Sequence, residues 1–278
     1  MRVYLYGSFQ DGTRPNRVSK DVNFGDRIIY QTVSGFLEKC GFEVDFILPN
    51  EDDKICTLTD ADRLVIGGGG LIHSMLLNQP SIEISKARKA VFGLGINWEN
   101  GTKPPTIRDL TSTAAFLKGI PFLMVRDWQT KAFIRSDRAQ VCPDVSLLHW
   151  IGDSEPGKER ALVAHSALQP REGEVLISFN SVHTTENSEA IIDPVQLRRF
   201  GHIRTSSYHG MLLAFTVNAT AEVYVHNVKQ QAFFSSYWDH LDIEERDGAL
   251  LVKCKDPGWF KSEVENGLER LAVHLEKG

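Results

Sequence analysis

The chain has 278 residues, a length that suits two modest domains or one large one. Its 42% hydrophobic and 24% charged residues are close to the globular average, which excludes an intrinsically disordered or collagen-like chain. Lys and Arg number 31 against 36 for Asp and Glu, and the resulting net charge of -5 argues against nucleic acid as the main partner.

Signals for export and for disulfide bonds are weak. No apolar stretch reaches the roughly 18 residues needed to span a bilayer, and the N-terminal MRVYLYGSF has no apolar core of a signal peptide. The four cysteines are scattered without a C-x-x-C pair, so we expect reduced thiols rather than a zinc site or disulfides. These features predict a cytoplasmic protein.

Apolar periodicity and glycines divide the first half of the chain into alternating strands and helices. The predicted strands are residues 2–6, 44–48, 63–66, 90–96 and 122–125. The predicted helices are residues 24–40 and 107–117. Such alternation is typical of a parallel sheet that is covered by helices on both faces.

The polar segment 153–160 contains Pro and Gly and is the candidate linker between two halves. After it the predicted strands are 161–165, 175–180, 202–204 and 222–225, and the predicted helices are 193–200, 206–217, 230–238 and 259–276. We therefore expect an α/β protein with two Rossmann-like domains that face a cleft. Their predicted bounds are 1–152 and 160–258, and a C-terminal helix at 259–278 packs back toward the first domain.

In open α/β sheets, ligands bind at the carboxyl ends of the strands. Gly68, Gly69 and Gly70 lie between a predicted strand and a helix expected to begin near Leu71, where backbone N–H groups can approach an anion. The run fits neither a dinucleotide fingerprint nor a P-loop, so a tight turn with close helix packing is an equal alternative. Asp26 stands at the start of the helix 24–40, where helix capping competes with a role in the cleft.

Arg126 follows the predicted strand 122–125. A cation at this place is suited to bind a carboxylate or a phosphate, and the alternative is a structural ion pair with the adjacent Asp127. Asp144 follows another short apolar run and presents the same choice between capping and chemistry.

The segment RTSSYHG at residues 204–210 holds the densest group of candidates. It contains Arg204, the hydroxyls of Ser206 and Ser207, and His209, which is expected in the first turn of a helix beside free N–H groups. A histidine in that position is suited to acid/base work. Lys229 follows the next predicted strand, so it either faces the same crevice or is a solvated loop lysine.

Seven of these landmarks, taken in order, resemble the polysaccharide pyruvyl transferase family. The family pattern is N-x-G-D before a long helix, an apolar strand into G-G-G, G-x-G, V-R-D, P-D, T-S-S-x-H-G and a following Lys. In this chain they are residues 23–26, 67–70, 93–95, 125–127, 143–144, 206–210 and Lys229. The T-S-S-x-H-G form looks like the branch that modifies bacterial exopolysaccharides.

The resemblance implies a fold of glycosyltransferase-B type and a transferase that moves the pyruvyl group of phosphoenolpyruvate onto a sugar. The acceptor is expected to be a hydroxyl pair of a cell-surface polysaccharide or its lipid-linked precursor, and the product a pyruvate ketal. A lipid-linked acceptor would bring the enzyme to the inner face of the membrane. No metal and no cofactor is implied beyond phosphoenolpyruvate as the donor.

By motif, the resemblance places Arg126, His209 and Lys229 around the donor, with Asp26 as a weaker match. We expect the two cations to bind the carboxylate and the phosphate, and His209 to give a proton to the methylene carbon. Ser207 stands where another branch of the family has an Arg, and Arg204 is the candidate replacement. The sequence VNAT at 217–220 also departs from the family's G-x-P.

Two other functions stay open from the sequence. The first is a glycosyltransferase that uses a nucleotide sugar on the same two-domain architecture. The second is a catalytically degenerate family member that serves as a binding subunit, an interpretation favoured by the missing Arg at position 207.

Overall fold

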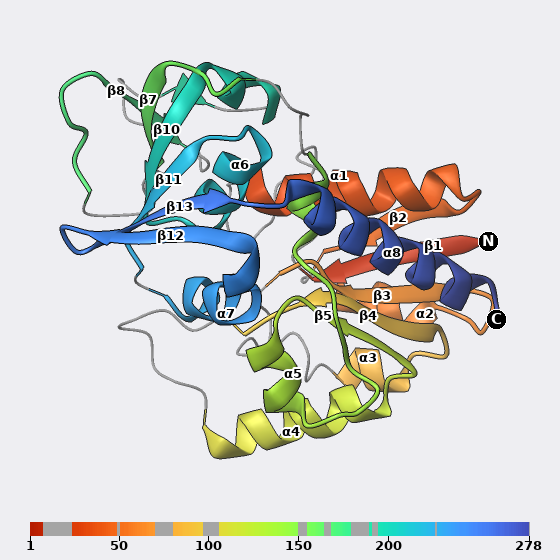
Figure 1. Cartoon of the computed structure of the whole chain (residues 1–278). Helices are drawn as coiled ribbons and strands as arrows, with labels where there is room; N and C mark the ends of the chain where they lie inside the picture. The colour runs from red at the N-terminus through yellow and green to blue at the C-terminus, as the bar shows by residue number, and fades with distance from the viewer. Residues whose placement is uncertain are drawn as a thin grey trace.

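The computed structural model describes residues 1–7, 24–48, 51–69, 80–96, 106–149, 155–163, 168–178, 189–190, 194–225 and 227–277. Figure 1 shows two layered α/β units, with the longest helix lying along the lower one. We refer to the sheet nearer the N-terminus and its helices as the first unit, and to the other sheet and its helices as the second unit.

The first sheet is entirely parallel, with the strand order β2-β1-β3-β4-β5-β6. Its strands are β1 (Arg2–Gly7), β2 (Glu43–Ile47), β3 (Arg63–Gly67), β4 (Arg88–Leu94), β5 (Phe122–Val125) and β6 (Gln140–Val141). The chain leaves β1 for β2 on one side and returns to β3 on the other. The carboxyl ends of β1 and β3 therefore form the topological switch point, where open α/β sheets bind ligands.

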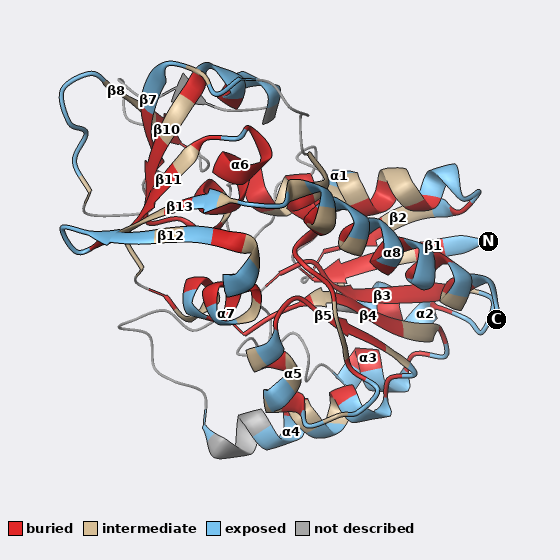
Figure 2. Ribbon diagram, in the orientation of Figure 1, coloured by how far each residue is buried: buried red, intermediate tan, exposed pale blue. Residues whose placement is uncertain are grey.

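Helices cover both faces of this sheet. They are α1 (Phe24–Lys39), α2 (Asp52–Thr57), α3 (Pro80–Ile84), α4 (Ile107–Gly119), α5 (Trp128–Ile134) and α8 (Pro257–Glu276). Alternate strand residues enter two apolar clusters, one shared with α1 and α8 and the other with α2 to α5. Figure 2 shows the resulting pattern of buried strands between helices that are exposed on their outer sides.

The second sheet has the order β12-β13-β11-β10-β7-β8-β9 and is mixed. Its strands are β7 (Glu159–Val163), β8 (Glu174–Ser178), β9 (Glu189–Ala190), β10 (Phe200–Thr205), β11 (Thr220–Val223), β12 (Leu241–Arg246) and β13 (Ala249–Cys254). The strands β11, β10, β7, β8 and β9 are parallel to one another. Strand β13 pairs with β11 in antiparallel orientation, and β12 pairs with β13 in the same way. The remaining helices are α6 (Tyr208–Thr216) and α7 (Val228–Tyr237) and the 3-10 helices η2 (Val145–His149), η4 (Pro194–Arg199) and η5 (Trp238–His240).

The α/β class expected from the sequence is confirmed by these two sheets and their helices. The expectation of parallel sheets alone was wrong for the second sheet, because β12 and β13 form an antiparallel hairpin at its edge. Its turn is Asp247-Gly248, with φ of 51° and 77°, a dipeptide typical of tight hairpins. The predicted helix 193–200 was also wrong, since η4 occupies most of it and β10 begins at Phe200.

Other expectations remain predictions. The linker was expected to extend to Arg160, but β7 already begins at Glu159. The domain bounds, the Rossmann-like domains and the glycosyltransferase-B likeness stay predictions. The helix expected near Leu71 lies outside the described residues. In the described part of the chain, no helix is both long enough and apolar enough to cross a membrane.

The two units share parts of their cores. Phe24 and Ile28 of α1 are buried in the apolar cluster of the second unit, although α1 belongs to the first. In the first turn of helix α8, Phe260 is buried in that same cluster. Later residues of α8, such as Leu268, are buried against the first sheet. The N-terminal turn of α1 is therefore fixed by packing from both units.

Candidate functional site

Polar side chains gather where several strands end. Asp26 lies in the first turn of α1, which follows β1, and Arg126 comes directly after β5. Asp144 precedes η2, while His209 and Lys229 are each the second residue of their helices, α6 after β10 and α7 after β11. Elements of both units thus bring these groups together beyond the carboxyl ends of strands from two sheets.

Asp26 is the centre of this cluster. Burial raises the pKa of its carboxyl from 3.8 to about 7, and the negative charge of Asp144 acts in the same direction. The positive charges of Lys229 and Arg126 lower that pKa without cancelling the effect of burial. The carboxyl therefore changes its protonation state near neutral pH, beside two cations.

Arg126 is only 2% exposed, and protein groups surround its guanidinium. Nη1 lies 3.8 Å from Asp144 Oδ2, Nε lies 3.8 Å from Asp127 Oδ2, and Nη2 donates a hydrogen bond of 3.2 Å to the Ile96 carbonyl. The guanidinium carbon lies 4.6 Å from the centre of the Tyr208 ring. Burial alone would lower the pKa of Arg126, but Tyr208 and the acidic groups raise it, so the charge persists. Within the described part of the chain, Nε donates no hydrogen bond.

The two carboxylates beside Arg126 are held by local capping. Asp127 is the N-cap of α5 and accepts a 2.6 Å hydrogen bond from the backbone N–H of Thr130. Asp144 accepts hydrogen bonds from Ser146 N at 3.0 Å and Ser146 Oγ at 2.8 Å, all through Oδ1. In each case the other oxygen faces Arg126, so capping and ion pairing are combined rather than exclusive.

Gly95, the second glycine of the G-x-G motif, makes room for Arg126. A Cβ atom at this position would overlap the guanidinium group. The earlier glycine run is used differently, because Gly68 N donates to the Phe92 carbonyl at 3.2 Å and Gly69 O accepts from Gly95 N at 3.1 Å. These backbone contacts favour the tight-turn interpretation of the run, and anion binding by Gly68 and Gly69 stays a prediction. Gly70 lies outside the described residues.

His209 lies between both units. Its imidazole packs against the backbone of Gly25 in α1, and its ring centre lies 5.4 Å from that of Tyr208 in an edge-to-face arrangement. Burial raises the pKa of Tyr208 well above its ordinary value, the charge of Arg126 lowers it, and the nearby Asp144 raises it again. The neutral ring of Tyr208 therefore connects His209, Arg126 and Asp144 in one packed arrangement.

Three of the predicted donor-binding residues have structural contacts. Ser207 is the N-cap of α6 and accepts a 3.3 Å hydrogen bond from Gly210 N, while the Ser206 carbonyl accepts one of 3.2 Å from Gln230. Arg204 is 4% exposed and makes hydrogen bonds of 2.9 and 2.6 Å to the carboxylate of Glu174 on β8. Arg204 therefore forms an ion pair with Glu174 and does not lie beside Arg126, because its side chain extends from β10 toward β8. Whether Arg204 takes the place of the arginine missing at position 207 stays a prediction.

Sequence reasoning missed Tyr208 as a site residue. It occupies the variable position of T-S-S-x-H-G, so no motif marks it, and a buried aromatic residue at a helix start is ordinary core. Only its contacts with a cation, a carboxylate and an imidazole show its place in the cluster.

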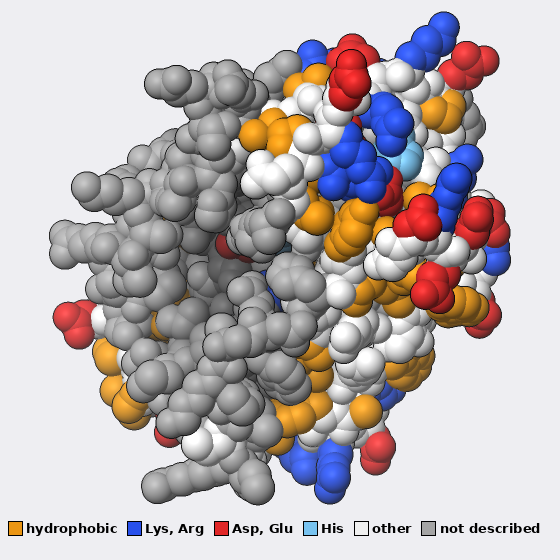
Figure 3. Space-filling view, turned by 90° about the vertical axis from the view of Figure 1, so that its left-hand side faces the viewer, with side chains coloured by type: hydrophobic (Ala, Val, Ile, Leu, Met, Phe, Trp, Pro, Cys, Tyr) orange, Lys and Arg blue, Asp and Glu red, His pale blue; other side chains and the backbone are white. Residues whose placement is uncertain are grey.

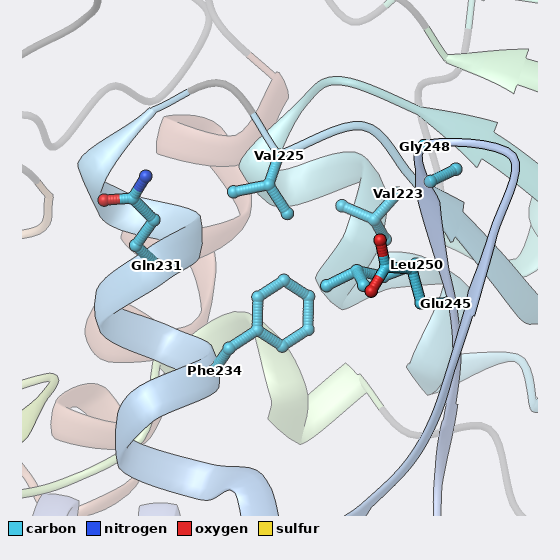
Figure 4. Close-up of a pocket in the computed structure, with 8 residues that line it drawn as sticks. Val223, Val225, Gln231, Phe234, Glu245, Gly248 and Leu250 are labelled. Carbon is cyan, nitrogen blue, oxygen red and sulfur yellow. The ribbon is translucent and has the colours of Figure 1, made fainter.

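The described residues contain no group of three or more His, Cys, Asp and Glu side chains that could hold a metal ion. A separate hollow of about 440 Å³ opens between α7 and the β12–β13 hairpin (Figure 4). Among the described residues, its lining includes Val223, Phe234 and Leu250 with the polar Gln231 and Glu245, but no Lys or Arg. This lining does not suit an anionic donor.

The second sheet carries a further polar network. Glu222 accepts a hydrogen bond from Arg171, lies 3.0 Å from His202 Nε2, and accepts another from the Tyr224 hydroxyl at 2.9 Å. Figure 3 shows acidic and basic side chains mixed at the upper right of the face nearest the viewer. Charges in this described region are therefore mixed rather than segregated.

Comparison with known proteins is consistent with the motifs. No curated protein matches the chain. A solved structure of an uncharacterized protein from Klebsiella pneumoniae is similar over 84% of this chain and 87% of its own, with 16% sequence identity and a TM-score of 0.49. The sequence profile described as polysaccharide pyruvyl transferase matches residues 23–194, which is more than half of the chain and includes the segment from Asp26 to Asp144. This protein therefore belongs to the polysaccharide pyruvyl transferase family.

Proposed function

We propose that the protein transfers the pyruvyl group of phosphoenolpyruvate to two hydroxyls of one sugar in a bacterial cell-surface polysaccharide or its lipid-linked precursor. Membership of the family supports a transferase of this class. The observation that carries the proposal is the cluster in which Asp26, with a pKa of about 7, lies beside the charges of Lys229 and Arg126. It combines cations for an anionic donor with a group that exchanges protons near neutral pH.

Phosphoenolpyruvate carries a carboxylate and a phosphate, which fit two cations and backbone donors. Lys229, at the start of α7 and near Asp26, contacts the donor directly in this proposal. Arg126 contributes its charge from the buried side of the cluster, where Nε still has a hydrogen bond to give. Ser206 and Ser207 are proposed to contribute only through the N-terminal turn of α6.

The transfer proceeds in two additions. His209 gives a proton to the methylene carbon, which becomes a methyl group, while one sugar hydroxyl adds to C2 and gives its proton to Asp26. The C2–O bond to phosphate then breaks, inorganic phosphate leaves with the bonding electrons, and the second hydroxyl attacks C2. The second hydroxyl's proton leaves with phosphate or solvent. The reaction changes no net oxidation state, so in this proposal it needs no redox cofactor.

A first experiment identifies the donor. The melting temperature of the protein is measured with phosphoenolpyruvate and, separately, with a set of nucleotide sugars, since a bound ligand stabilises the folded state. We expect phosphoenolpyruvate to raise it and the nucleotide sugars to leave it unchanged. The reverse result would favour a nucleotide-sugar glycosyltransferase.

A second experiment tests the transfer. The protein is incubated with phosphoenolpyruvate and a panel of soluble and lipid-linked glycans, and mass spectrometry detects the added pyruvyl ketal. We expect His209→Gln to bind phosphoenolpyruvate nearly as the wild type does and to lose turnover by about 10²-fold or more. If the wild type binds phosphoenolpyruvate but transfers no pyruvyl group to any glycan, the result would favour a binding subunit. Near-normal turnover in His209→Gln would assign the proton transfer to another group.

A further inference from the structure

Gly25 is buried at the second position of α1, directly beneath the imidazole of His209. A Cβ atom built on Gly25 would overlap three atoms of that ring, Nδ1, Cγ and Cε1, and these are the nearest atoms it would meet. The two residues come from different units, since α1 follows the first strand of the chain and α6 belongs to the second sheet.

The backbone of Gly25 gives no other reason for a glycine. Among the described glycines, those with positive φ are Gly7, Gly41, Gly67, Gly68, Gly93, Gly173 and Gly248. Gly25 has the backbone conformation of a helix, in which alanine is more stable than glycine. The requirement for a residue without a side chain therefore comes from the packed imidazole and not from the local chain.

The imidazole has little freedom to move away from a methyl group at this place. On one side lies the ring of Tyr208, with 5.4 Å between the ring centres. Tyr208 is itself fixed, because it is buried and its ring packs on Arg126 at 4.6 Å and edge-to-face on Phe233 at 6.2 Å. Displacing His209 would therefore disturb groups on both units.

We propose that Gly25 is a positioning residue for His209. Because Gly25 has no side chain, the imidazole from the second unit can pack directly on the N-terminal turn of α1 in the first unit. The next residue in the chain is Asp26, so the same packing brings His209, the proposed proton donor, close to Asp26, the proposed proton acceptor. The catalytic consequence rests on the proposed function, whereas the packing consequence does not. A methyl group at position 25 moves the ring, and a misplacement of about 1 Å can lower turnover by about 10²-fold.

The kinetic test compares Gly25→Ala with Gly35→Ala. Gly35 lies in the same helix, and a Cβ there meets no atom within 4 Å. We expect Gly25→Ala to lower kcat by roughly 10- to 100-fold with KM changed by less than about threefold, because the donor cations are untouched. Gly35→Ala is expected to keep wild-type kinetics and to raise Tm by about 1–4 °C through helix propensity. Wild-type kcat in Gly25→Ala would overturn the positioning role.

The packing test needs no activity. Tm is measured for Gly25→Ala, His209→Ala and the double variant, a cycle that isolates the coupling between the two positions. We expect Gly25→Ala to lower Tm in the wild-type background and to leave it unchanged or raise it once the imidazole is gone. If Gly25→Ala alone does not fold, recovery of folding in the double variant is the same result. Additive changes in Tm would overturn the proposal.

The NMR signals of the His209 ring provide a third measurement, with His209→Gln used to assign them. We expect them to shift in Gly25→Ala and to stay in place in Gly35→Ala. Unshifted signals would overturn the proposal. If the wild type transfers no pyruvyl group, only the proposed function is refuted. The double-variant cycle in Tm and the NMR signals of the His209 ring would still decide whether Gly25 positions His209.

Discussion

Replacing Asp26 by Asn should make the protein more stable above neutral pH and leave it almost unchanged in acid. The asparagine side chain has nearly the shape of the neutral carboxyl but cannot ionise. The wild-type carboxyl must ionise in a half-buried site, among the charges of Lys229, Asp144 and Arg126, as pH rises through about 7. The amide of the variant avoids that requirement.

The magnitude follows from the difference in pKa between the two states of the chain. In the unfolded chain Asp26 loses its proton near 3.8, whereas in the folded protein it does so at about 7. Between these values the unfolded state binds fewer protons, so the stability of the wild type falls as pH rises and levels off above about 7. Each pH unit is worth about 1.36 kcal/mol, so about three units give an upper limit of about 4 kcal/mol. From pH 5 to pH 8 the expected change is about 2–3 kcal/mol.

The assay is urea unfolding of the wild type and Asp26→Asn at pH 5 and pH 8. The variant's advantage in unfolding free energy should grow by about 2–3 kcal/mol between the two pH values, while pyruvyl transfer is lost. Asp53→Asn, at an exposed position of α2, is the control and should stay within about 0.5 kcal/mol of the wild type at both. An advantage that is the same at pH 5 and pH 8 would refute a carboxyl at position 26 that ionises at about 7.

Arg126→Ala should weaken phosphoenolpyruvate binding by about 1.5–3 kcal/mol in calorimetry on folded protein, and an unchanged affinity would leave Arg126 as a structural ion pair only. Lys229→Met should weaken donor binding and, because Lys229 lowers the pKa of Asp26, shift the fall of stability with pH to higher pH; an unmoved transition would show that Lys229 does not act on Asp26. Arg204→Ala leaves the buried carboxylate of Glu174 without its cation, although the Arg171 backbone N–H still donates to it, and should cost about 3–5 kcal/mol of stability in urea, with donor affinity retained; a loss of affinity at full stability would place Arg204 in the donor site.

Much of the fold could be predicted from local pattern. Strand β5 has the predicted bounds 122–125, and α1 ends within one residue of its predicted end, because apolar periodicity and a following Gly41 mark them. The β12–β13 hairpin was overlooked although Asp247-Gly248 marks its turn. No strand was expected between the predicted helices 230–238 and 259–276, where the chain instead forms this antiparallel hairpin.

By itself, the sequence determined the α/β class and the family, and it placed Arg126, His209 and Lys229 after strands, because each of these features is written in short-range spacing. Only the tertiary structure decided which side chains meet. Arg204 stands five residues before His209 yet pairs with Glu174, since alternate residues of a strand point to opposite faces. Tyr208 and Gly25 entered the site through contacts between units, and burial among those contacts raises the pKa of Asp26 to about 7. Such contacts depend on how two sheets dock, and no local periodicity encodes that.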